Sequence, residues 1–192
     1  QNEDLKRAVA AYNSGDYAKA VSLWEPHARQ GNREAQYSMG VAFYEGKGAS
    51  RDLDQAIAWF RKAADSGHPT AMFNLGVAYW EGRGVKQNFS QAVDWWERAA
   101  ELGDITSQYN LGLAYYLGKG AERDISKARD WLSRSAEQQH ADARRVLGII
   151  DKNNPAVKND QPATPAKPKA SVDTRSETAQ QESLSPAKTT AP

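Results

Sequence analysis

Apolar residues recur along the chain at the spacing of an α-helix. Ala35, Met39 and Phe43 stand four residues apart, and the same face returns 36 residues later and again after a further 36. Residues at i, i+4 and i+8 lie on one side of a helix, so each run predicts an amphipathic helix. No segment alternates with the two-residue period of a half-buried strand. The pattern therefore predicts an all-α protein.

The whole pattern repeats with a period of 36 residues. The columns that keep this step include glycines (Gly40, Gly76, Gly112, Gly148; Gly46, Gly82, Gly118; Gly48, Gly84, Gly120), alanines (Ala56, Ala92, Ala128) and tryptophans (Trp59, Trp95, Trp131). A fixed period of this length is typical of stacked repeats, in which one unit cannot bury its apolar face alone. We assign units to residues 34–69, 70–105 and 106–141, after a shorter helix pair at 1–33 and before a capping helix at 142–151.

Each unit predicts two helices joined by a glycine turn. The second helix begins near Leu53, where the Asp52 side chain is a natural N-cap. It ends before Gly67, which suits a left-handed C-cap. The third unit has Gln139 in that place, so its second helix is expected to end less cleanly. A small residue such as Gly40 allows the paired helices to approach closely.

The second unit carries a recognisable motif. Its sequence "TAMFNLGVAYWEGRGVKQNFSQAVDWWERAAELG" fits AxxxLGxxYxxGxGVxxDxxxAxxWxxxAAxxG at nearly every marked position, with Asn88 where aspartate is usual. This motif resembles the Sel-one-like repeat, a relative of the tetratricopeptide repeat with a longer turn. The resemblance covers about residues 4–150 and implies an α-α superhelix, or solenoid. It also implies an adaptor or scaffold for protein partners, and bacterial members are often exported.

The composition of the chain limits the kinds of partner and chemistry that can be expected. A formal net charge of +1 gives no basic footprint for nucleic acid, and no apolar run approaches the ~20 residues of a membrane span. With no cysteine, disulfides and thiolate chemistry are excluded. Residues 152–192 contain no aromatic residue and hold six of the eight prolines. This Ala/Pro/Lys-rich tail is predicted to be disordered.

The glycine turns resemble a phosphate cradle only superficially. Gly46-Lys47-Gly48 lies in "YEGKGASRD", whereas a P-loop requires GxxxxGK[ST] between a strand and a helix. The same G-(K/R)-G recurs in all three units, as a turn between stacked helices would. We interpret it as a turn with positive φ angles and expect no cofactor.

The ionisable residues give no catalytic or metal motif. His27, His68 and His140 fall near helix ends without ligand spacing, so capping or surface roles are expected. Glu45 and Glu81 are equivalent residues of neighbouring units. A pair of carboxylates of the glycosidase kind is one interpretation of them, and solvated helix-end charges are the other.

A second stripe of residues follows the first helices at i, i+4 and i+7, off the core face. With its polar neighbours, which we include in what is called the stripe below, it comprises Tyr37, Ser38, Val41, Tyr44, Phe73, Asn74, Val77, Trp80, Tyr109, Asn110, Leu113, Tyr116, Arg145 and Ile149. In a tetratricopeptide-like superhelix these positions would face the concave side. Aromatic anchors beside amides suit a peptide or protein segment, with Trp80 and the pair Asn74 and Asn110 as leading contacts. Packing between successive first helices is the competing interpretation.

Three functional hypotheses follow. The first is a non-enzymatic adaptor, monomeric on its own, that binds an envelope protein. The second is an enzyme or ligand-binding protein acting on cell-wall material, although the cysteines of the family's wall-linked members are missing. The third is a module that presents another domain through the tail. Because the chain starts at Gln1, we expect signal-peptide removal and a periplasmic or secreted location, with the cytoplasm as the alternative.

Overall fold

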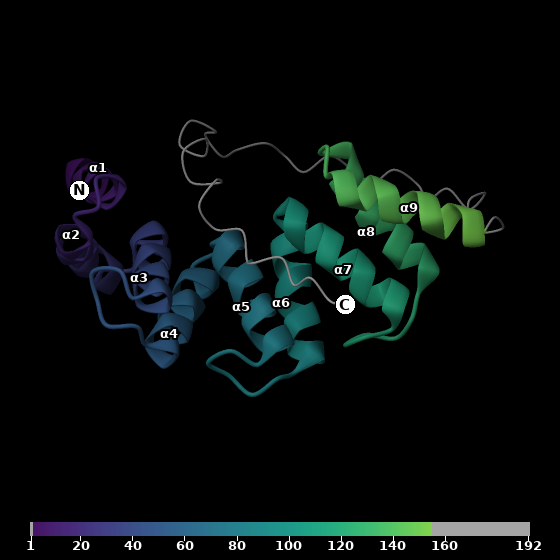
Figure 1. Cartoon of the computed structure of the whole chain (residues 1–192), viewed down its shortest axis with the longest axis horizontal. Helices are drawn as coiled ribbons and strands as arrows, with labels where there is room; N and C mark the ends of the chain where they lie inside the picture. Colours follow the sequence, from purple (N-terminus) through teal and green to yellow (C-terminus); the bar gives the residue numbers. More distant parts are fainter. Residues whose placement is uncertain (1, 155–192) are drawn as a thin grey trace. The chain divides into compact units, whose positions relative to one another are not determined.

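The computed structural model describes residues 2–154, which form a succession of α-helices without a strand in that range (Figure 1). The helices are α1 (Asn2–Asn13), α2 (Tyr17–Arg29), α3 (Arg33–Glu45), α4 (Leu53–Asp65), α5 (Pro69–Glu81), α6 (Phe89–Glu101), α7 (Ile105–Leu117), α8 (Ile125–Glu137) and α9 (Ala141–Asn153). The main contacts join each helix to the next one in the chain. This nearest-neighbour packing is that of a helical-repeat solenoid and confirms the predicted fold class.

The predicted segments relate simply to these helices. Pairs α3–α4, α5–α6 and α7–α8 correspond to the three units, each pair beginning one residue before the predicted unit, and α1–α2 forms the shorter opening pair. Helix α9 begins one residue before the predicted capping helix and continues to Asn153. Of the tail predicted to be disordered, residues 155–192 lie outside the described residues. No helix between residues 2 and 154 is long and apolar enough to cross a bilayer.

The second helices begin where the sequence predicts, because a side chain caps each one. Asp52, Asn88 and Asp124 each accept a hydrogen bond from the backbone N–H three residues on, at 3.0, 3.1 and 2.9 Å. These bonds satisfy one of the free N–H groups that every helix N-terminus leaves.

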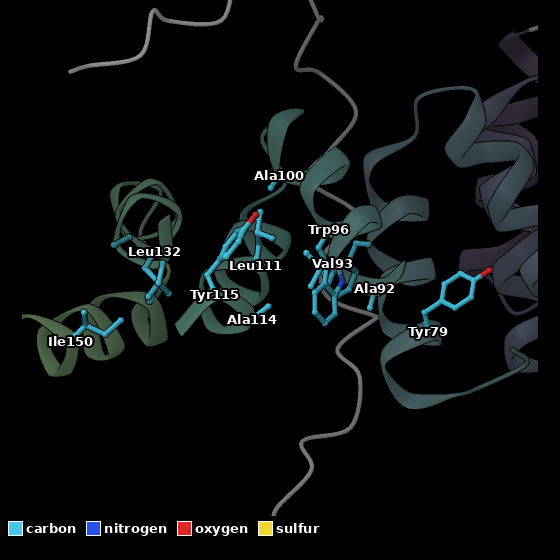
Figure 2. Close-up of a cluster of buried hydrophobic side chains, with 14 residues drawn as sticks. Tyr79, Ala92, Val93, Trp96, Ala100, Leu111, Ala114, Tyr115, Leu132 and Ile150 are labelled. Carbon is cyan, nitrogen blue, oxygen red and sulfur yellow. The ribbon is translucent and has the colours of Figure 1, made fainter. Parts of the chain in front are cut away.

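The core lies between the helices of each pair and between neighbouring pairs. Figure 2 shows its C-terminal part, which runs from Tyr79 through Trp96 and Leu132 to Ile150. A Cβ on Gly40 would overlap the buried Phe60 ring. The glycine column therefore sets the close approach of the paired helices, as expected.

The end of α8 differs from its prediction. Gln139 adopts a φ of 70°, the only positive φ of a non-glycine residue among residues 2–154. Helix α8 has 13 residues, the same length as α4 and α6. The expectation of a less clean end was wrong, because Gln139 takes the left-handed conformation of Gly67 and Gly103 instead of shifting the helix end.

Candidate binding surface

The stripe runs along α3, α5, α7 and α9, and its exposure increases from the first of these helices to the last. Tyr37 and Val41 on α3 are 8% exposed, whereas the equivalent Tyr109 and Leu113 on α7 are half-buried. On α9 the equivalent residues are Arg145, which is exposed, and Ile149, which is 47% exposed. Helix α5 is intermediate in the exposure of its stripe residues: Phe73 is buried, and Asn74, Val77 and Trp80 are half-buried.

The buried end of the stripe packs one unit against the next. The Tyr37 ring stacks on His68, the N-cap of α5, with 4.4 Å between ring centroids. Burial raises the pKa of the Tyr37 hydroxyl, and a hydrogen bond with Asn74 opposes that shift. Ser38 bonds the Glu34 carbonyl of its own helix, at 2.9 Å. Tyr37, Ser38 and Asn74 therefore already have partners within the chain.

The same stacking recurs two units later in a more open setting. Tyr109 lies 4.6 Å from His140, centroid to centroid. Burial again raises the pKa of Tyr109, and the nearby Asp142 carboxylate adds to the shift. Because Tyr109 and the adjacent Asn110 are only half-buried, part of this pair faces solvent.

The two histidines of these stacks are N-caps, as their positions near helix ends suggested. Nδ1 of His68 accepts from the Ala71 N–H and Nδ1 of His140 from the Ala143 N–H, each at 3.2 Å. Nε2 of His68 lies 3.1 Å from the Glu34 carboxylate, and this hydrogen bond lowers the pKa of Glu34. No group of three or more histidine and acidic side chains within residues 2–154 is arranged to hold a metal ion.

The aromatic residues at the ends of the first helices are covered by cations from the next unit. Arg83 donates from Nη1 to the Tyr44 hydroxyl at 3.0 Å. The Nζ atom of Lys119 lies 4.7 Å from the centroid of Trp80. The sequence pattern alone indicated only a place in the turn for these cations. The contact between aromatic residue and cation could have been predicted from the sequence, because both columns repeat with the same 36-residue period.

Trp80 and Tyr116 differ in how firmly they are held. Trp80 packs against Phe89 and Trp96, with centroids 4.9 and 5.0 Å away. Tyr116 is half-buried and is approached by Arg123 of its own turn, whose guanidinium carbon is 5.9 Å from the ring centroid. Trp80 is thus part of the packing, although one side of it remains accessible.

The two candidate acids of the enzyme hypothesis are each neutralised locally. Glu45 pairs with Lys47 at 3.0 Å, and Glu81 pairs with Arg83 at 2.8 Å. Glu45 also accepts from the Tyr12 hydroxyl at 2.7 Å. These contacts make both carboxylates members of ion pairs with the cations of their own turns.

Comparison with known families gives a match over most of the folded region. A family model described as Sel1 repeat matches residues 33–68, 69–104 and 105–140. A search of curated proteins gives no match.

Solved structures with the same fold come from several bacteria. Protective antigen c5321 of uropathogenic Escherichia coli, which displays an SLR fold, is 34% identical with a TM-score of 0.76, covering 80% of this chain and 34% of its own. A Sel1 repeat protein from Oxalobacter formigenes is 28% identical with a TM-score of 0.75, covering 78% and 62%. Cysteine rich protein B of Helicobacter pylori shares the fold at 20% identity and a TM-score of 0.55, covering 69% and 95%. The chain thus spans about a third of c5321 and less than two thirds of the Oxalobacter protein.

Proposed function

The chain belongs to the Sel1 repeat family, and we propose that it is a non-enzymatic scaffold that holds a protein partner on the C-terminal half of its stripe. Sel1 repeat proteins are in general protein-interaction scaffolds. What is proposed for this chain is the surface, the absence of catalysis and the setting in which it acts.

One observation supports the choice of surface. The stripe is closed by repeat packing at Tyr37 and Val41 and opens at Leu113, Arg145 and Ile149. A stripe that combines an exposed aliphatic side chain with amide and aromatic groups has the composition of a binding anchor with a polar rim. In a tetratricopeptide-like superhelix this part of the stripe faces the concave side.

We place the partner in the bacterial envelope, as a wall, secretion or motility component bound by a single copy of this chain. The description of c5321 as a protective antigen agrees with a periplasmic or secreted location. The local neutralisation of Glu45 and Glu81 supports the absence of catalysis.

The test is site-specific photo-crosslinking in bacterial cells, followed by fractionation. A photoreactive residue at Ile149, which is 47% exposed, is compared with one at Leu102, which is 55% exposed and lies at the end of α6 outside the stripe. We expect a discrete protein adduct in the envelope fraction from position 149 and none from position 102.

Equal adducts from both positions, or an adduct only in the cytoplasmic fraction, would contradict the proposal. The absence of catalysis is tested separately with purified protein and isolated cell-wall fragments. Turnover that is lost in Glu45→Gln or Glu81→Gln would show that the protein is an enzyme.

A further inference from the structure

Each repeat turn carries a small cluster of side chains that joins two units. It contains the aromatic residue at the end of the preceding first helix, the residue that begins the preceding second helix, the residue that ends the unit's own first helix, and the turn cation. We call this group the turn cluster. It occurs three times, so each copy can be compared with the other two.

The first turn cluster is internally neutral and satisfied. Lys47 lies 5.7 and 5.4 Å from the ring centroids of Tyr12 and Tyr17. Its ammonium pairs with the Glu45 carboxylate at 3.0 Å, and the same oxygen accepts from the Tyr12 hydroxyl at 2.7 Å. The hydrogen bond with Glu45 raises the pKa of Lys47. Nothing in this copy lacks a partner.

The second turn cluster repeats the arrangement. Arg83 pairs with the Glu81 carboxylate at 2.8 Å and donates to the Tyr44 hydroxyl at 3.0 Å. In both copies the residue that ends the first helix is therefore the acid that neutralises the turn cation.

The third turn cluster lacks that acid. Lys119 lies 4.0 Å from the Phe89 centroid and 4.7 Å from the Trp80 centroid, which places its ammonium over two large rings. The position of Glu45 and Glu81 is taken by Leu117, which is 61% exposed. Among the described residues no carboxylate pairs with Lys119, and this includes Glu122 three residues on.

This difference has a chemical meaning. The cation, its aromatic support and the geometry of the turn are all retained, but the position of the counter-charge holds an exposed aliphatic side chain. A ligand that restores the pattern of the other two copies must supply a carboxylate to Lys119. It must also supply an apolar group next to that carboxylate. Such a group would cover the exposed Leu117 side chain, and the removal of apolar surface from water would favour binding.

We propose that the third turn cluster binds a protein segment in which an aspartate or glutamate adjoins an aliphatic or aromatic side chain. The carboxylate takes the place on Lys119 that Glu45 and Glu81 hold on their own turn cations. The apolar side chain packs on Leu117. The proposal rests on the scaffold function above and names the chemistry of the partner at one end of the bound segment.

The probe is a library of random 12-residue peptides displayed on phage and selected on the full chain. Selected sequences are then synthesised and their affinities are measured by titration. We expect enrichment of Asp or Glu next to Leu, Ile, Val or Phe. Affinity should fall as the salt concentration rises, since the cation is exposed.

Leu117→Glu is the decisive variant, because it gives the third cluster the composition of the first two. We expect it to weaken binding about tenfold or more while the helical circular dichroism and melting temperature stay unchanged. Leu102→Glu is the matched control. It makes the same substitution at another exposed helix-end leucine and should leave the affinity unchanged. Lys119→Gln should reproduce the loss.

The outcomes separate this inference from the scaffold function. Peptides that lose affinity with Arg145→Glu but not with Leu117→Glu would overturn the proposed site and leave the scaffold function standing. A selection without acidic–apolar sequences, or an equal loss in Leu117→Glu and Leu102→Glu, would overturn the site as well.

Discussion

The glycine column of the first helices contains one residue type in two different environments. At Gly76 an added Cβ would overlap the indole of Trp96, which is 4% exposed. At Gly148, in the same column, no atom lies within 4 Å of the added Cβ. The glycine is therefore required by packing on α5 and not on α9, where no second helix follows within the described residues.

Alanine substitutions in this column should have opposite signs. Gly76→Ala forces a core indole to move and should lower the free energy of unfolding by about 1–3 kcal/mol. Gly148→Ala only improves the helix propensity of an exposed position and should raise it by up to about 1 kcal/mol. Urea titration followed by circular dichroism measures both. Changes of the same sign in the two variants would contradict the packing role of Gly76.

Gln139 is the second position where a single residue decides a local conformation. Its φ of 70° lies in the left-handed region, which costs a residue with a Cβ about 1–2 kcal/mol. Gln139→Gly removes that strain but also frees the unfolded chain, so a net gain of about 0.5–1 kcal/mol in the free energy of unfolding is expected. Gln139→Ala keeps the strain and is the control. The urea midpoint should rise for glycine alone, and an equal rise for alanine would show that the conformation is unstrained.

Residues of this kind mark the limit of what the sequence predicts. Asp52 as a cap and Gly40 as a contact follow from residue type and period, and both were predicted. For Tyr37 the sequence left packing and recognition as alternatives, because its burial depends on His68, the N-cap of α5, whose ring stacks on it. Periodicity places residues on a helix face but does not show which neighbouring unit covers that face.

At the scale of the elements, the first helices α3, α5, α7 and α9 use one column for their N-caps. Asn32, His68, Asp104 and His140 each accept from the backbone N–H three residues on. Asp104 is the charged member in a buried setting. Burial raises its carboxyl pKa, although hydrogen bonds from Ser107 oppose the shift. A raised pKa means that the ionised form is less favourable in the folded protein than in the unfolded chain.

Asp104→Asn should therefore stabilise the protein at neutral pH by a few tenths of a kcal/mol up to about 1 kcal/mol. Asparagine caps as well as aspartate and already occupies this column in Asn32. Because the pKa of Asp104 is raised in the folded protein, its protonated form favours folding. This contribution to the free energy of unfolding is complete below the ordinary aspartate pKa of 3.8 and is lost as the pH rises through the pKa of the folded protein. The advantage of the variant should thus be full at pH 7 and vanish toward pH 3.

Urea titrations of both proteins across that pH range measure the difference, and Asp124→Asn, at an N-cap of a second helix, is the control. Its carboxylate caps α8, so a change shared by both variants would come from the loss of charge at an N-cap and not from the burial of Asp104. An advantage of Asp104→Asn that is independent of pH would contradict the electrostatic explanation.

At the scale of the whole molecule, the buried side chains gather in separate clusters along the repeats. One lies in α1–α4 and includes Trp24, Met39 and Trp59. Another extends from α5 to α9 and includes Trp96 and Ile150. The number, order and pairing of the helices could be predicted, because each unit contacts only its neighbours and the period gives the register. The exposure of each stripe residue could not be predicted, because it depends on which neighbouring helices cover that residue.

This arrangement predicts that a destabilising substitution in the helices at one end of the stack lowers the stability of those helices and leaves the helices at the other end unchanged. Ile150 on α9 is fully buried, and the neighbouring Asp151 pairs with Arg129 of α8 at 2.8 Å. Ile150→Ala leaves a cavity that should lower the stability of α8–α9 by about 2–4 kcal/mol. In a solenoid with nearest-neighbour interactions, that loss opens the terminal helices before the rest of the stack. Hydrogen exchange measured by mass spectrometry should show faster exchange in residues 125–153 and unchanged protection in residues 17–65.

The matched variant Ala20→Gly on α2, at a fully buried position of the other cluster, should give the reverse pattern. Uniformly faster exchange from either variant would mean that residues 2–154 unfold as one cooperative unit, and the nearest-neighbour description of this fold would fail.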